Sequence, residues 1–319
     1  MRIKQIVVLG LILSILVAGS TGCLRRAQQK PIPGPRVEDT NKPEPKISLF
    51  VNASGEKKQI GIEEYIAGVV AAEMDTSWPV EALAAQAILA RTFTMENIKT
   101  GRVKKLHGTD ASTSVEEFQA YAPEKINANV RKAVAMTRGE VVLYKDKYIH
   151  AWFHACDGGK TATAAEGLAY YKEPTPYVKV VEDGCLKITV PENRWWTAKF
   201  STQQVRQAVL KSTGKDPGEF SQVRIAKKGP SGRAELIKVG GEVLSGPALR
   251  LALGSEVVRS MKLDNLYVQG NMVVFQGKGF GHGVGLCQWG ANQLARSGKA
   301  PEDIVNYYFK DIAIKKQWK

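Results

Sequence analysis

The stretch that decides the fold runs from residue 64 to residue 92 and reads EYIAGVVAAEMDTSWPVEALAAQAILART. Apolar side chains recur at helical spacing after Ile62 and predict a helix that ends close to Glu73. Pro79 suits a first helical turn, so a second helix is expected from about residue 77 to residue 98. Its many alanines make a smooth surface that other elements can approach closely. We expect it to be the central helix of the domain.

Downstream segments add strands to these helices. Residues 139–144 and 148–154 are rich in β-branched and aromatic side chains around a short polar turn, which predicts a hairpin. Residues 194–275 mix an amphipathic segment with short apolar runs and predict an inserted smaller subdomain. A glycine-dense loop, residues 277–285, precedes a helix expected over residues 288–296. Because helices and strands are segregated along the chain, the predicted fold class is α+β, with a helical core and antiparallel strands.

The start of the chain resembles a targeting segment. Two basic residues precede an uncharged apolar run within residues 1–24, the layout of a secretion signal or membrane anchor. Small residues before Cys23 also fit a lipoprotein signal, and both alternatives stay open. Residues 25–46 mix prolines with charges and predict an extended linker. We therefore expect a protein tethered to the cell membrane on its extracytoplasmic face, with a folded domain over residues 47–319.

The charge of the chain restricts its partners. Lysine and arginine number 45 against 31 acidic residues, which gives a formal net charge of +14. Such an excess favours nucleic acid, acidic lipid or cell-wall polymer. The predicted export argues against nucleic acid, so we expect an anionic partner outside the cytoplasm.

Glu73 is the leading candidate for an acid/base residue. It lies where the first helix ends, in an apolar context beside Trp78. Partial burial raises the pKa of a carboxyl group, which a general acid needs at neutral pH. The alternative is a salt-bridged carboxylate at a helix end. Arg91, on the second helix, could point toward Glu73 or toward a substrate carboxylate.

A second candidate segment is the glycine loop with the helix that follows it. Its glycines do not match the dinucleotide-binding pattern, so a phosphate-binding loop is not expected. Glycine at alternate positions lets the backbone come close to a ligand or to another chain segment, with His282 as a donor or proton carrier. The predicted substrate-binding residues are Gly281, Gly283, Gln288 and Trp289, the last as a stacking face for a sugar.

A third segment contains histidine and cysteine. On a strand, His150, His154 and Cys156 would alternate onto one face, and Cys185 could join them. Such side chains are suitable zinc ligands. The predicted metal ligands are Cys156, Cys185 and His150, with a Cys156–Cys185 disulfide, free thiols, or a lone His154 in the active site as the alternatives.

These three segments, in this order, resemble the stage II sporulation protein D family, the SpoIID/LytB-type domain. The resemblance covers about residue 47 to the C-terminus. It is carried by Glu64-Tyr65-Ile66, Gly68-Val69-Val70, Glu73-Met74, Trp78-Pro79, Glu81-Ala82-Leu83, Ala85-Gln86-Ala87, Ala90-Arg91-Thr92 and Gly281 to Ala291. Three departures are Ala84, Cys287 and Trp289, where the family pattern has lysine, serine and tyrosine.

The resemblance implies a lytic transglycosylase that acts on peptidoglycan strands already stripped of their stem peptides. It also implies that the protein acts together with a peptidoglycan amidase and other engulfment proteins during engulfment of the forespore. Carried over residue by residue, the family's catalytic positions fall on Glu73, Arg91, His154 and His282. The reaction needs no cofactor, although some members bind zinc.

The expected chemistry uses one carboxyl group. Protonated Glu73 would donate to the glycosidic oxygen between N-acetylmuramic acid and N-acetylglucosamine and then take the proton of the C6 hydroxyl, which closes a 1,6-anhydro ring. Two rival hypotheses are a zinc-dependent amidase built on the His150, His154 and Cys156 segment, and a non-catalytic wall-binding scaffold.

Overall fold

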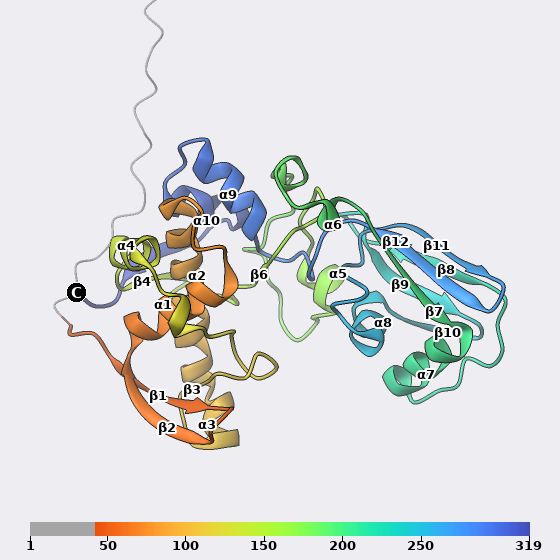
Figure 1. Ribbon diagram of the computed structural model, residues 1–319, viewed down its shortest axis with the longest axis horizontal. Helices are drawn as coiled ribbons and strands as arrows, with labels where there is room; N and C mark the ends of the chain where they lie inside the picture. Colours follow the sequence, from red (N-terminus) through yellow and green to blue (C-terminus); the bar gives the residue numbers. More distant parts are fainter. Residues whose placement is uncertain (1–41) are drawn as a thin grey trace, which may run out of the picture. The chain divides into compact units, whose positions relative to one another are not determined.

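The computed structural model describes residues 42–319. The predicted anchor lies outside these residues, as does the linker up to residue 41. No helix in the described part of the chain is both long and apolar enough to span a membrane. The fold is α+β, as predicted, with helices around one core and several small sheets (Figure 1).

The first hydrophobic core surrounds the alanine-rich helix. α1 (Ile62–Glu73) and α2 (Val80–Thr100) form where the sequence predicted helices, and α2 packs against helices from both ends of the chain. Its small side chains permit this, because Ala82, Ala84, Ala87 and Ala90 are fully buried. The other helical elements of this part are α3 (Arg102–His107), η1 (Pro123–Lys125), α4 (Ala128–Met136), α9 (Gln288–Arg296) and α10 (Pro301–Tyr308).

Two small sheets border these helices. The first has the order β2-β1-β3, in which β1 and β2 are antiparallel and β3 runs parallel to β1. The second has the order β14-β4-β5 and is antiparallel. Their strands are β1 (Lys46–Val51), β2 (Glu56–Gly61), β3 (Ala111–Ser112), β4 (Glu140–Tyr144), β5 (Lys147–Tyr148) and β14 (Ala313–Lys316).

The predicted hairpin forms only in part. Lys145 and Asp146, both at positive φ, make the turn between β4 and β5, but β5 already ends at Tyr148. The chain then leaves the sheet, and β6 (Phe153–His154) pairs in parallel with β13 (Leu286–Cys287) instead. The prediction of one continuous strand over residues 148–154 is therefore wrong, because a partner from the far end of the sequence takes its second half.

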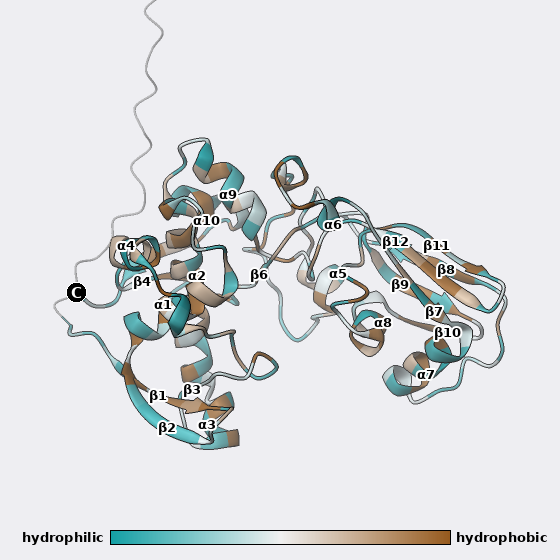
Figure 2. Ribbon diagram, in the orientation of Figure 1, coloured by the Kyte–Doolittle hydropathy of each residue, from teal (hydrophilic) through white to brown (hydrophobic). Residues whose placement is uncertain are grey.

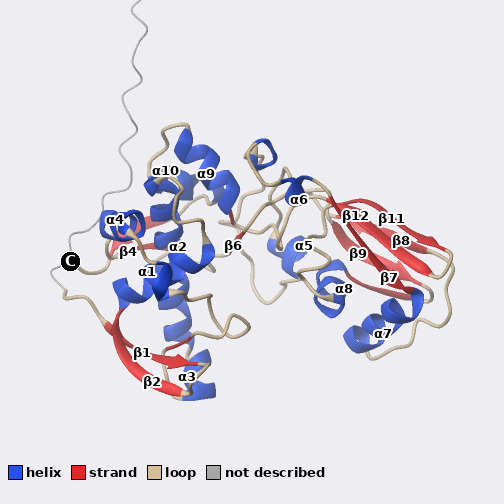
Figure 3. Ribbon diagram, viewed as in Figure 1, coloured by secondary structure: helices blue, strands red, loops and turns tan. Residues whose placement is uncertain are grey.

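A second hydrophobic core lies within residues 196–275. Two antiparallel three-stranded sheets, β10-β9-β8 and β11-β12-β7, contribute their buried apolar residues to it. Figure 2 shows hydrophobic residues along these strands, and Figure 3 shows the strands in red. The elements are β7 (Trp196–Ser201), α7 (Thr202–Thr213), β8 (Val223–Lys228), β9 (Ala234–Val239), β10 (Glu242–Ser245), α8 (Gly246–Leu253), β11 (Leu263–Gln269) and β12 (Met272–Gly277). Short pieces precede them: α5 (Ala164–Leu168), η2 (Cys185–Lys187) and α6 (Pro191–Arg194).

Arg233 ties this stretch to the loop that follows β6. Its guanidinium group is fully buried and donates to the main-chain oxygens of Asp157 and Lys160. Glu166 on α5 accepts hydrogen bonds from the backbone amides of Ser231 and Arg233. The second core therefore supports the same loop that carries part of the candidate site.

Candidate functional site

Glu73 lies at the junction of two cavities. The α1 helix ends there because Met74 is extended, with φ −129° and ψ 156°. One cavity, of about 350 Å³, and the other, of about 330 Å³, share Glu73, Phe153 and His282 in their walls. Together they make a groove on both sides of the carboxyl group, which suits a chain-like ligand.

The surroundings of Glu73 favour its protonated form. Burial raises the pKa of this carboxyl group, while hydrogen bonds from the Ala120 amide and the Gln288 side chain oppose the rise. The Ala120 nitrogen lies 3.2 Å from Oε1 of Glu73. No Lys or Arg side chain forms an ion pair with Glu73 within the described residues. This arrangement can supply a general acid.

Two neutral histidines line the groove beside Glu73. His154 and His282 have ring centroids 5.5 Å apart. Burial lowers the pKa of His154 well below its ordinary value and lowers the pKa of His282 to about 3. Nδ1 of His154 lies 3.2 Å from the Val284 oxygen, which assigns the proton to Nδ1 and leaves Nε2 as a buried acceptor without a partner among the described residues. Neutral rings of this kind orient polar substrate groups without adding charge.

The glycines of the loop serve close approach between chain segments. Gly281 has φ 108°, and a Cβ there would lie 2.8 Å from the Cβ of His154. Gly283 has φ 85°, and a Cβ there would overlap the Arg233 guanidinium. Gly281 lines the 350 Å³ cavity, whereas Gly283 is buried against Arg233. The predicted contact of Gly283 with substrate is therefore corrected to a packing role.

Gln288 and Trp289 separate on the helix that follows the loop. Gln288 is the first residue of α9, lines the cavity and hydrogen-bonds Glu73. Trp289 instead packs against Trp78, with ring centroids 4.6 Å apart, and lines neither cavity beside Glu73. The half-buried Trp289 thus packs against the first core outside both cavities, and its predicted sugar-stacking role stays a prediction.

Arg91 lies away from the groove. It is fully buried on α2, where Nε and Nη2 donate to the two carboxylate oxygens of Glu63 at 3.0 and 2.7 Å. Its Nη1 donates to the main-chain oxygen of Glu140 at 2.9 Å. All three nitrogens are thus occupied by the protein itself. The structure thus places Arg91 in the core and outside the groove, and its predicted catalytic role stays a prediction.

Residues 196–275, which contain the second hydrophobic core, also contribute side chains to the cavity beside Glu73. The sequence patterns did not reveal these side chains. Arg250 on α8 and Glu256 in the loop after it line the cavity together with Glu73 and Phe280. Burial lowers the pKa of Arg250 to about 10, so the guanidinium stays charged. Neither residue belongs to a recognisable motif, and only the fold brings them beside Glu73.

The predicted metal ligands do not all meet. His150 lies 2.7 Å from Glu173 and 3.6 Å from Glu96, outside the cysteine cluster. β5 ends at Tyr148, so His150 and Cys156 do not lie on one continuous strand and do not share a face. Cys156 and Cys185 do meet, with sulfur atoms 3.1 Å apart. The histidine member of the predicted set is therefore wrong, and a zinc-dependent amidase loses its predicted ligands.

Sequence profiles of known protein families match two parts of this chain. A sequence profile described as Stage II sporulation protein matches residues 52–144, and one described as a domain of unknown function (DUF8618) matches residues 187–285. The chain is 33% identical over 259 residues to an uncharacterized protein of Brachyspira hyodysenteriae, covering 80% of this chain and 67% of that protein.

Two relatives from Bacillus subtilis have descriptive names. The chain is 30% identical over 283 residues to the stage II sporulation protein D of this organism, covering 84% of this chain and 78% of that protein. It is 26% identical over 293 residues to the protein named amidase enhancer, covering 76% of this chain but 39% of that protein.

Proposed function

Because the chain belongs to the stage II sporulation protein D family, we propose that it is a lytic transglycosylase that cleaves the glycan strands of bacterial peptidoglycan. The observation that carries the proposal is the carboxyl group of Glu73, buried enough to raise its pKa and placed in the middle of a groove. A polymer lying in that groove would present a glycosidic oxygen to this single acid.

The proposed reaction moves two protons, one from Glu73 and one back to it. Glu73 donates its proton to the glycosidic oxygen, and the C1–O bond breaks as positive charge develops on the muramic acid ring. The resulting carboxylate then removes the proton of the C6 hydroxyl, whose oxygen closes on C1. The products are a 1,6-anhydro end and a free hydroxyl end, and Glu73 is protonated again. No water is consumed.

The groove also supports the substrate class. A glycan strand without stem peptides has a free lactyl carboxylate on each muramic acid, and Arg250 places a cation in the cavity that can bind it. His154 lines the same cavity, so its ring can contact the acetamido group of a bound sugar. Attachment of a peptide would remove the lactyl charge, which agrees with a preference for stripped strands.

The setting of the reaction is part of the proposal. The predicted anchor would hold the enzyme on the outer face of the membrane, and its net charge of +14 would favour contact with the anionic wall. An amidase that removes stem peptides would act before it. A relative is named amidase enhancer, which supports such a pairing. The proposed process is forespore engulfment during sporulation.

A second candidate reaction follows from Glu256. This exposed carboxylate lines the same cavity as Glu73. A second carboxylate can activate water, which would make the enzyme a hydrolase with an ordinary reducing end. The first reaction needs Glu73 alone, and the product distinguishes the two reactions.

The test is mass spectrometry of peptide-free glycan strands after incubation with the purified full-length chain. We expect 1,6-anhydro-muramic ends, which disappear with Glu73→Gln and persist with Glu256→Gln as the matched control. Reducing ends lost with Glu256→Gln would establish the hydrolase instead. Strands left intact by the wild-type chain would overturn both reactions and favour the non-catalytic scaffold.

A further inference from the structure

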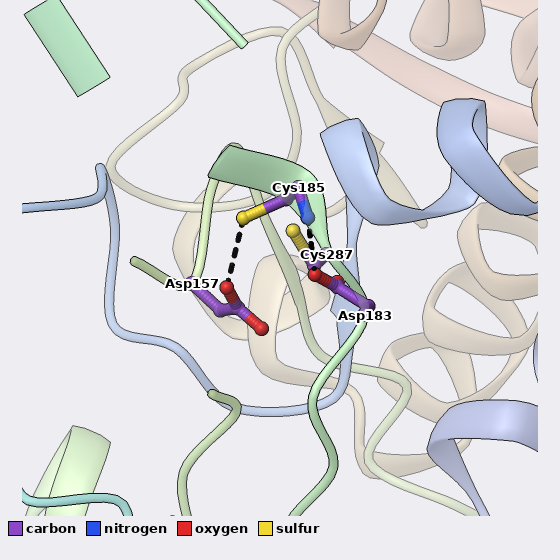
Figure 4. Close-up of side chains that lie close together, drawn as sticks. All are labelled: Asp157, Asp183, Cys185 and Cys287. Carbon is purple, nitrogen blue, oxygen red and sulfur yellow. Dashed lines mark hydrogen bonds between the residues drawn. The ribbon is translucent and has the colours of Figure 1, made fainter. Parts of the chain in front are cut away.

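A second polar cluster lies buried beside the loop that follows β6. Ligand atoms of Asp157, Asp183, Cys185 and Cys287 all lie within 4.8 Å of one another (Figure 4). All four side chains are buried. A third buried cysteine, Cys156, contacts this cluster, because its sulfur lies 3.1 Å from the sulfur of Cys185. The sequence pattern had suggested only two of these five residues as ligands.

The carboxylate of Asp157 is incompletely satisfied. Its Oδ1 accepts hydrogen bonds from the Gly159 amide at 2.7 Å and from the Cys185 thiol at 2.9 Å. Its Oδ2 is buried and has no hydrogen-bond partner within the described part of the chain. A buried carboxylate oxygen without a partner is costly, so it indicates a position prepared for a cation.

Asp183 is held more completely. Its Oδ1 accepts from the Cys185 amide at 2.9 Å, and its Oδ2 accepts from the Tyr308 hydroxyl at 2.7 Å. This carboxylate therefore fixes the backbone of Cys185 and lies next to the cluster with both oxygens occupied. Such an arrangement is typical of an outer carboxylate that orients a metal ligand.

The neighbouring cation does not neutralise the cluster. Arg233 is buried close by, but its guanidinium donates to the main-chain oxygen of Asp157 and not to the carboxylate. The buried Oδ2 of Asp157 therefore keeps no cationic or hydrogen-bonding partner among the described residues.

We propose that this cluster binds one zinc ion, with the thiolates of Cys156, Cys185 and Cys287 and the carboxylate of Asp157 as its ligands. Four ligands from sulfur and oxygen match the tetrahedral preference of zinc, and three thiolates select it over magnesium or calcium. Asp183 and Tyr308 complete the surroundings. Cys287 stands where the family pattern has serine, so the site belongs to this chain and not to the pattern.

The position of the cluster indicates a supporting role. Cys156 follows β6, which contains His154, and Cys287 is the last residue of β13, directly before Gln288. A zinc ion here would join both walls of the Glu73 groove to the η2 segment that carries Cys185. No open position faces the groove in this set, so the ion would stabilise the pocket without entering the reaction.

Metal content tests the proposal without any substrate, which separates it from the proposed reaction. The full-length chain is purified without chelator and its metals are measured by plasma mass spectrometry. We expect about one zinc per chain, lost in Cys185→Ser and Cys287→Ser. Cobalt substitution should give strong thiolate-to-metal absorption in the near ultraviolet. His150→Ala is the matched control and should retain the zinc.

Asp157→Asn covers the case in which the cysteine variants fail to fold. This variant keeps the side-chain shape, and we expect a native circular dichroism spectrum with zinc affinity lowered at least tenfold. Unchanged affinity in Asp157→Asn, loss of zinc in His150→Ala, or a wild-type chain that stays free of metal after incubation with zinc would each overturn the proposal. Peptide mapping that finds a Cys156–Cys185 disulfide in the native protein would also overturn it.

Discussion

α1 carries a buried glutamate, Glu63, at its start and a half-buried one, Glu73, at its end, and the two side chains have different surroundings. Glu63 accepts four hydrogen bonds, from two nitrogens of Arg91, the Gly139 amide and the Trp318 indole. Glu73, ten positions later, receives one amide and the Gln288 side chain and faces a groove. Hydrogen-bond and ion-pair partners, and not residue type or helix position, therefore separate a structural carboxylate from a chemically available one.

Glu73→Gln should have the largest effect on function. Removing the acid should lower the rate of strand cleavage by roughly 10²–10⁴-fold, because no other group replaces the proton donor. The thermal midpoint at neutral pH should be unchanged or higher, since burial disfavours the ionised Glu73. Strand cleavage and thermal unfolding are measured on the same preparations. Full activity in this variant would show that Glu73 is not the proton donor and differs little in role from Glu63.

Arg91→Met should have the largest effect on stability. It leaves the Glu63 carboxylate buried without its cation, which typically costs about 3–5 kcal/mol. Denaturant unfolding measures the loss, and cleavage per folded molecule should stay within a few-fold of wild type. A variant of unchanged stability that has lost cleavage would support the predicted catalytic role of Arg91.

Glu140→Gln should change how stability depends on pH. Burial, followed by the nearby Glu302, raises the pKa of Glu140 from 4.5 to about 7. Because the folded-state pKa lies above the unfolded one, the stabilisation is complete below about pH 4.5 and is lost as pH rises through about 7.

The glutamine variant should remove this dependence, which amounts to about 3 kcal/mol at most. Unfolding free energies measured from pH 4 to pH 8 provide the test. Parallel curves for wild type and variant would show that Glu140 titrates normally beside the Glu63 network.

Trp289→Phe should have the smallest effect. The contact with Trp78 is worth about 1 kcal/mol, so unfolding should become easier by a similar amount. The KM for glycan strands should change less than twofold, because Trp289 lines neither cavity beside Glu73. A tenfold rise in KM with unchanged stability would support the predicted sugar-stacking role of Trp289.

Local patterns predicted the helical part of the fold. The boundaries of α1 and α2 follow from apolar periodicity and Pro79, which act within one helical turn. The strand after Tyr148 was wrong because its second half pairs with Leu286 and Cys287. A partner more than a hundred residues away leaves no local trace in the sequence.

The candidate site was predictable where motifs mark it. The structure brings Glu73, His154, His282 and Gln288 to one cavity. The catalytic roles of the first three and the substrate-binding role of Gln288 stay predictions. The sequence pattern allowed Arg91 to face Glu73, but the structure pairs it with Glu63, a glutamate of the same charge at the other end of α1. Arg250 lies outside the motifs, in a stretch whose sequence gave no indication that it borders the groove.

β6 and β13 are far apart in the sequence, so they pair late in folding. His154 contacts Val284 across 130 positions of the chain. Closing so large a loop is slow compared with forming α1 and α2, whose contacts are local. A chain still being synthesised would therefore contain the acid of Glu73 but not the loop that completes its groove. The groove around Glu73 is thus complete only after the whole chain has been made and has folded.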